Sequence, residues 1–133
     1  MKHKAAFKLE LQQRVLILTA NGVWTLADAK DYVRELRALV KPIVDQPWAI
    51  IMDTAAWQMS PADVFALLQE NTRWCFNNNL VQAVTILPND QLLQWQFSKA
   101  TAIEKPEGFI SQTATDIAAA RKLVQAAGFT LTD

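Results

Sequence analysis

Apolar and polar residues follow one another along this chain in segments that predict a mixed α/β fold. Residues 7–11 alternate apolar and polar side chains, which is typical of a strand with one solvated face. Residues 15–18 and 48–52 are apolar runs, and such runs predict strands that are covered on both faces. A fourth strand is predicted at residues 80–87 and a short edge strand at residues 108–110. The pattern therefore predicts a small sheet of about five strands.

Four further segments have helical periodicity. Apolar residues recur three and four positions apart, as do Ala29, Tyr32, Val33 and Leu36. The predicted helix starts are Thr25, Ser60-Pro61, Asn89 or Asp90, and Thr115 or Asp116. Gly128 stands where a left-handed residue ends the last helix. The order β-β-α-β-α-β-α-β-α predicts an α/β domain with a mixed sheet and four helices.

Size and composition fit one folded domain over residues 1–133. The chain is 51% hydrophobic and 20% charged, with 13 basic and 13 acidic residues and a formal net charge of zero. Domains that bind nucleic acid normally carry a basic excess, so we expect no nucleic-acid partner. No apolar run approaches the roughly 18 residues of a membrane span, and no signal-peptide core is present. We expect a cytoplasmic protein.

The residue types that carry most enzyme chemistry are scarce in this sequence. His3 is the only histidine, which excludes His-dependent triads and most zinc sites. Cys75 is the only cysteine and lies on an apolar helix face, as a core residue does. The three glycines are far apart, so no phosphate-binding loop is present. We expect a protein that is not an enzyme and that has no cofactor and no metal.

The segment between Asp53 and Asp63 is the main candidate site. It joins a buried strand to a helix start, and α/β domains place ligand sites at the carboxyl ends of strands. Trp57 is predicted to lie in a short loop within it, and tryptophan is enriched at binding hot spots. The candidate surface consists of Asp53, Trp57, Met59, Ser60, Asp63 and, on the following helix, Trp74.

Most of these residues also have a structural interpretation. Ser60 caps the helix by accepting from the amide of Asp63, or it is a phosphate acceptor at the helix N-terminus; Asp63 would repel that phosphate, which favours the cap. Asp53 accepts from the backbone of the turn that follows it, or its carboxylate acts as a base or metal ligand. Trp57 covers the edge of the core, or it lines a pocket or interface.

Four stretches of the sequence carry a resemblance to a known family. They are residues 15–18 running into Asn21-Gly22, residues 50–53, residues 81–87, and residues 108–110 followed by the helix at 115–127. Together they resemble a small bacterial STAS domain of the kind grouped with anti-sigma-factor antagonists. The resemblance extends to the STAS-like branch that is linked to CRAL-TRIO lipid-binding folds.

The resemblance implies the fold and a protein partner. In that family a kinase phosphorylates a serine or threonine in an Asp-Ser-Ser/Thr-Gly run at the helix after the third strand. Residues 59–63 occupy that place here, with Ser60 as the only hydroxyl and no glycine after it. This chain therefore departs from the motif on which the family's phosphorylation switch depends.

Two functions from different classes follow. The first is a non-enzymatic binding or regulatory module that contacts a protein through the Asp53-to-Asp63 loop and the following helix. The alternative is a carrier of a small apolar molecule or lipid, with a pocket near Trp57 and Trp74. Trp74 and Trp95 lie off the main apolar faces of their helices, and a homodimer interface would also explain them. An enzyme would require the carboxylates of Asp53 and Asp63 to converge.

Overall fold

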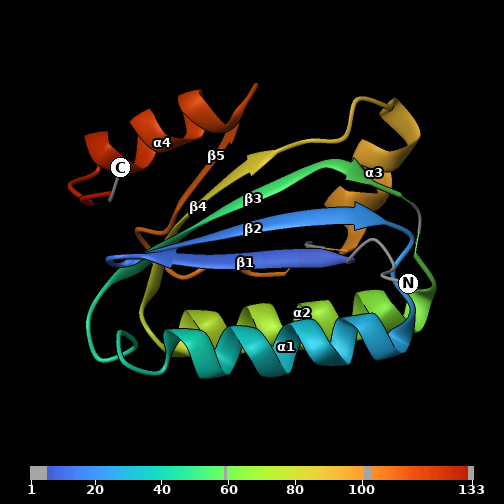
Figure 1. The fold of residues 1–133 in the computed structure, drawn as a ribbon, viewed down its shortest axis with the longest axis horizontal. Helices are drawn as coiled ribbons and strands as arrows, with labels where there is room; N and C mark the ends of the chain where they lie inside the picture. Colours follow the sequence, from blue (N-terminus) through green and yellow to red (C-terminus); the bar gives the residue numbers. More distant parts are fainter. Residues whose placement is uncertain (1–5, 59, 101–102, 132–133) are drawn as a thin grey trace, which may run out of the picture.

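A computed structural model describes residues 6–58, 60–100 and 103–131. Within these residues the strands and helices have the order predicted from the sequence (Figure 1). The elements are β1 (Phe7–Gln12), β2 (Val15–Gly22), α1 (Leu26–Val40), β3 (Trp48–Trp57), α2 (Ala62–Asn77), β4 (Leu80–Ile86), α3 (Gln91–Ala100), β5 (Ile110–Ala114) and α4 (Ile117–Ala126). The predicted α/β fold class is confirmed.

The strands form one mixed sheet in the order β1-β2-β3-β4-β5. The hairpin strands β1 and β2 are antiparallel, and every later pair is parallel. Parallel neighbours need a crossover, which α1, α2 and α3 supply in turn. Figure 1 shows α1 and α2 side by side below the sheet and α4 on its opposite side.

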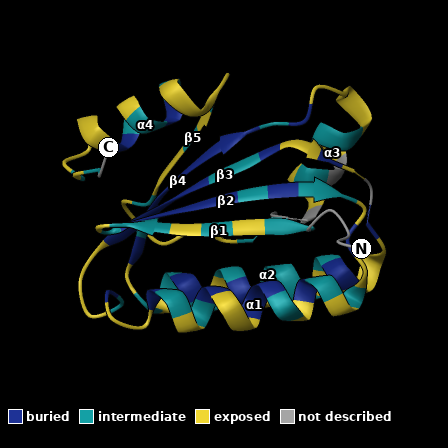
Figure 2. Ribbon diagram, in the orientation of Figure 1, coloured by how far each residue is buried: buried dark blue, intermediate teal, exposed yellow. Residues whose placement is uncertain are grey.

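The core has two parts because successive strand residues point to opposite faces of the sheet. Leu16, Leu18 and Ile50 face α1 and α2, and Trp48, fully buried, belongs to the same part. Val15, Ile17, Ile51 and Val84 face α4, which contributes Ala120 and Val124. Figure 2 shows buried residues along the central strands and on the helix faces turned toward them. This double cover explains why the central strands are nearly continuous apolar runs.

Several local signals in the sequence act as predicted. Thr25 and Asp28 form a reciprocal capping box at the start of α1. Asp116 caps α4 by accepting from the amide of Ala119. Gly128 has φ +104°, and the amide of Phe129 donates to the carbonyl of Val124, 3.0 Å away, in the bonding pattern of a Schellman motif.

Several predicted strand boundaries are wrong, and β2 itself runs past residue 18 to Gly22. The third strand continues five residues past Met52 to Trp57, because parallel pairing with β2 extends as far as Gly22 opposite Trp57. The edge strand is Ile110–Ala114, not residues 108–110, because the polar residues after Ile110 pair with β4. An edge strand with one solvated side tolerates such residues. In the described part of the chain, no helix is both long and apolar enough to cross a membrane.

Candidate functional site

The carboxyl end of β3 and the start of α2 form the site predicted from the sequence; we name residues 53–63 the β3–α2 junction. Trp57 is the last residue of β3, and only 4% of its surface is exposed. Its ring centroid lies 6.1 Å from that of Phe65 and 6.1 Å from that of Phe97. The prediction of a loop at Trp57 is therefore wrong, because pairing with β2 extends β3 to this residue. The burial of its side chain agrees with its structural interpretation.

Ser60 is also buried, and its hydroxyl serves a different element. Its Oγ accepts from the backbone N–H of Trp24 at 3.2 Å. The residue that caps α2 is Pro61, with no side-chain bond to the helix. The predicted cap from Ser60 to Asp63 is therefore wrong, because the buried amide of Trp24 takes the oxygen instead. The Ser60 side chain would have to give up this hydrogen bond and become exposed before a kinase could phosphorylate it.

The two carboxylates of the junction are held by nearby backbone amides. Asp53 accepts from the N–H of Ala55 at 3.1 Å, which agrees with its structural interpretation. Asp63 accepts from the N–H of Val64 at 2.9 Å. No group of three or more histidine, cysteine, aspartate or glutamate side chains suited to a metal occurs among the described residues. Met59 lies outside the described residues.

Trp74 belongs to a separate part of α2. The guanidinium of Arg37 on α1 lies 4.8 Å from the centre of its indole ring. Arg37 also donates to Asn71 Oδ1 at 3.2 Å and pairs with Glu70 at 3.3 Å. Trp74 therefore contacts Arg37 across the line where α1 and α2 meet, and it does not line the cavity that Trp57 lines. The predicted pocket near both tryptophans is corrected to a pocket near Trp57 alone.

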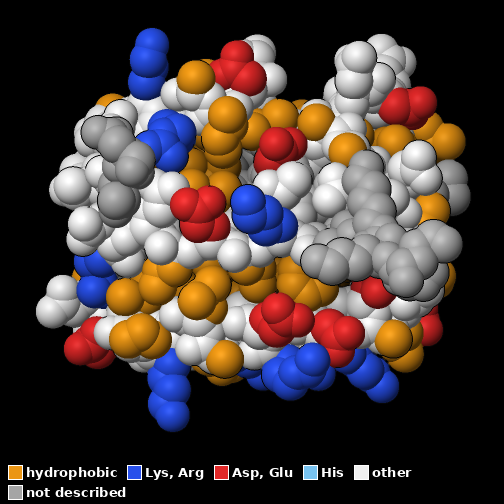
Figure 3. Space-filling model, viewed as in Figure 1, with side chains coloured by type: hydrophobic (Ala, Val, Ile, Leu, Met, Phe, Trp, Pro, Cys, Tyr) orange, Lys and Arg blue, Asp and Glu red, His pale blue; other side chains and the backbone are white. Residues whose placement is uncertain are grey.

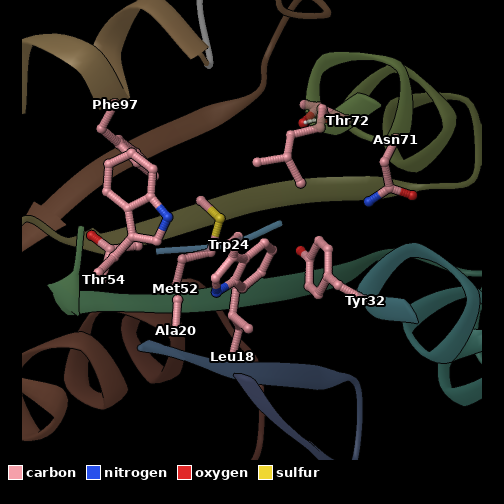
Figure 4. A pocket seen from close by; sticks show the side chains of 11 residues that line it. Leu18, Ala20, Trp24, Tyr32, Met52, Thr54, Asn71, Thr72 and Phe97 are labelled. Carbon is pink, nitrogen blue, oxygen red and sulfur yellow. Dashed lines mark hydrogen bonds between the residues drawn. The ribbon is translucent and has the colours of Figure 1, made fainter. Parts of the chain in front are cut away.

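Two adjoining cavities lie between the sheet and the helices α2 and α3. One has a volume of about 60 Å³ and the other about 110 Å³. The side chains that line both are Tyr32, Met52, Asn71, Thr72 and Phe97. Trp57 lines only the smaller cavity. Figure 4 shows the smaller cavity, with Asn71 and Thr72 of α2 across from Leu18 and Met52 of the sheet.

Sequence reasoning missed most of this cavity. Trp24, Tyr32 and Asn71 come from a loop and two helices, so no local pattern connects them. The one available signal was Asn71, a polar residue on the apolar face of α2 between Leu68 and Cys75. It is 3% exposed, and its amide lies 3.9 Å from Cys75 Sγ.

Burial keeps two ionisable groups that line the larger cavity, Tyr32 and Cys75, in their neutral forms. Burial raises the pKa of the Cys75 thiol to about 12, although Arg37 opposes the shift. Burial, reinforced by Cys75, raises the pKa of the Tyr32 hydroxyl above its usual value of 10.0. Neither group is an effective nucleophile near neutral pH, because the thiolate and phenolate forms are suppressed.

No protein-family model matches the chain, and no curated protein sequence matches it. Among solved structures, an uncharacterised DUF3478-family protein of SpoIIAA-like fold from Shewanella loihica has a TM-score of 0.65 at 14% identity, covering 92% of this chain and 98% of its own. The unphosphorylated anti-sigma factor antagonist SpoIIAA has a TM-score of 0.61 at 11% identity over 93% of this chain and 100% of its own. An anti-sigma factor antagonist from Mycobacterium paratuberculosis has a TM-score of 0.57 at 14% identity over 90% and 92%. The chain thus has the SpoIIAA-like, STAS fold.

Proposed function

We propose that this chain is a non-enzymatic regulatory module that binds a protein partner through the β3–α2 junction. Two of the solved structures that share its fold are anti-sigma factor antagonists, which act in regulation. The junction lies at the carboxyl edge of the parallel strands, where α/β domains most often bind partners or ligands. The chemistry of the junction favours binding over catalysis, because the side-chain oxygens of Asp53, Ser60 and Asp63 already accept from backbone amides.

The observation that carries the proposal is the way in which the junction is anchored. The side chains of Trp57 and Ser60 point inward and hold the junction backbone in place. Trp57 packs against Phe65 in the core, and Ser60 accepts from the backbone N–H of Trp24. Gln58, Pro61, Ala62 and Asp63 are left exposed on the outside. A surface that is already rigid loses little conformational entropy when a partner docks. The junction therefore offers a docking surface that these two anchors preorganise.

Replacing Ala62 with arginine tests this surface. We expect the variant to retain at least tenfold less partner from a native lysate than the wild-type chain does, because a long charged side chain obstructs a close-packed interface. The control is Ala118→Arg, which places the same side chain on an exposed alanine in the first turn of α4. The measurement is quantitative mass spectrometry of proteins that co-purify with each form.

The outcome depends on the contrast between these two variants. A partner that Ala118→Arg retains and Ala62→Arg loses supports docking at the junction. Equal retention by both variants, or equal loss, contradicts it. Circular dichroism of both variants checks that the fold is unchanged, as expected for exposed positions.

A second candidate function rests on the apolar cavities. Together they are on the scale of the roughly 150 Å³ engineered cavity that binds benzene. They would hold a single aromatic ring, and they are too small for a lipid acyl chain. The ligand class we propose is therefore a small, uncharged aromatic molecule that contacts Tyr32, Met52 and Phe97.

Benzene binding tests the cavities directly. We expect benzene at ten times its dissociation constant to stabilise the protein by about 1.4 kcal/mol, measured as a rise in melting temperature. Ala83→Leu fills the larger cavity, so it should abolish the rise, whereas Ala118→Leu on the surface of α4 should preserve it. A rise that is identical in all three proteins would show that benzene binds elsewhere.

A further inference from the structure

Strand β1 forms one edge of the sheet. Its outer side has no neighbouring strand among the described residues. It is six residues long and contains no proline or bulge. Natural edge strands usually carry a device that prevents pairing with another chain, such as proline, a bulge or unmatched charge. β1 has charged residues, and their arrangement decides what can pair with it.

The direction of the backbone groups of β1 follows from its pairing with β2. The N–H of Asn21 donates to the carbonyl of Ala6 at 2.8 Å, so the backbone N–H and C=O groups of Ala6 point toward β2. Backbone groups alternate in direction along an antiparallel strand. The backbone groups of Lys8, Glu10 and Gln12 therefore also point toward β2. The residues whose N–H and C=O groups point to the open edge are Phe7, Leu9 and Leu11.

The side chains of β1 also divide into two sets. Phe7, Leu9 and Leu11 are half-buried and pack against the α1 side of the core. Lys8 and Glu10 are exposed on the other face. Beside the edge is a hollow lined by Phe7, Lys8 and Leu9 of β1 together with Glu35, Ala38 and Leu39 of α1. Figure 3 shows a band of hydrophobic side chains where β1 and α1 meet, with charged side chains of both signs just above it.

Charge selects one register for pairing with a second copy of β1. Antiparallel pairing can join only the residues whose backbone groups point outward. Centred on Leu9, it places Lys8 of each copy opposite Glu10 of the other. Shifting the centre to residue 8 places two lysines opposite each other, and shifting it to residue 10 does the same with two glutamates. Like charges directly opposite are destabilising, whereas opposite charges stabilise.

We infer that two copies of this chain pair through the outer edges of β1, antiparallel and centred on Leu9. The pairing joins the two sheets into one and satisfies the outward backbone groups of β1. It brings Phe7 of one copy opposite Leu11 of the other and extends the apolar band over the hollow beside α1. The two Lys8–Glu10 pairs are symmetric, as a twofold interface requires. This interface is separate from the β3–α2 junction and does not depend on the proposed function.

Charge reversal tests both the interface and its register. Lys8→Glu sets two glutamates against each other at each symmetric site, and Glu10→Lys does the same with two lysines. We expect each single variant to raise the dimer dissociation constant about tenfold or more, and the double variant Lys8→Glu/Glu10→Lys to restore it. Mixing the two single variants should restore dimers, because each then supplies the charge that the other lacks. Sedimentation velocity over a range of concentrations measures this.

The charge reversals should leave the fold of the chain intact. Lys8 and Glu10 are exposed, and the one side-chain bond of Glu10 among the described contacts is to Gln12 on the same strand, so the fold should survive reversal. Glu104→Lys reverses an exposed charge in the loop before β5, at the opposite edge of the sheet, and should leave the dissociation constant unchanged. A wild-type chain that stays monomeric up to millimolar concentration overturns the inference. A dimer that is insensitive to the single reversals, or one that the double variant fails to restore, also overturns it.

Discussion

Replacing Trp57 with alanine is expected to lower the free energy of unfolding by about 3–5 kcal/mol. The side chain is 4% exposed and packs between the rings of Phe65 and Phe97. Its removal enlarges the cavity that it already lines, and the surrounding sheet and helices can close that space only in part. Urea denaturation followed by circular dichroism measures the change.

Trp95→Ala is the matched control for this prediction. Trp95 is 57% exposed on α3, with Lys99 Nζ 4.8 Å from its ring centre. Its removal should lower the free energy of unfolding by less than about 1 kcal/mol, because little buried area is lost. Equal losses in the two variants would contradict the burial of Trp57. The comparison also shows that Trp57→Ala is unsuited to mapping a docking surface, because it perturbs the fold.

Raising the pH from 8 to 11 is expected to lower the free energy of unfolding by about 4 kcal/mol. Burial raises the pKa of Cys75 from 9.0 to about 12, and it raises the pKa of Tyr32 above 10.0. The folded protein therefore holds both protons more tightly than the unfolded chain does. This contribution to stability is fully present below pH 9, where both states are protonated. It is lost as the pH rises toward the folded values, at about 1.4 kcal/mol per pH unit for each group.

The double variant Tyr32→Phe/Cys75→Ala isolates this effect. It removes both titrating groups while keeping apolar side chains at their positions in the core. Its stability is expected to fall by much less between pH 8 and pH 11, even though the variant starts from a lower value at pH 8. A decline as steep as that of the wild-type chain would mean that other groups control the alkaline transition.

The order of elements was predictable from the sequence because its signals are local. The capping box of Thr25 and Asp28 and the glycine at position 128 act within one turn of a helix. The central strands were predictable for a related reason: cover on both faces makes them continuously apolar. Such features depend on neighbours along the chain, which the sequence displays directly.

The errors at the candidate site arose from contacts between distant segments. Residues 53–56 lack the alternation of a strand, and they extend β3 only because β2 pairs with them. Ser60 looked like a helix cap, but its hydroxyl is engaged by an amide 36 residues away in sequence. The cavity combines residues of a loop, two strands and three helices. No pattern within one segment could have joined them.

Site-specific photocrosslinking tests most directly whether this chain acts by binding a protein at the β3–α2 junction. A photoreactive amino acid would replace Ala62 in one form of the full chain and Ala118 in another, since both alanines are exposed at helix starts. The crosslinks would be formed in the cells that produce the protein and identified by mass spectrometry. Docking at the junction predicts a defined partner that crosslinks from position 62 and not from position 118. No crosslinked partner at position 62, or the same set of proteins from both positions, would contradict it.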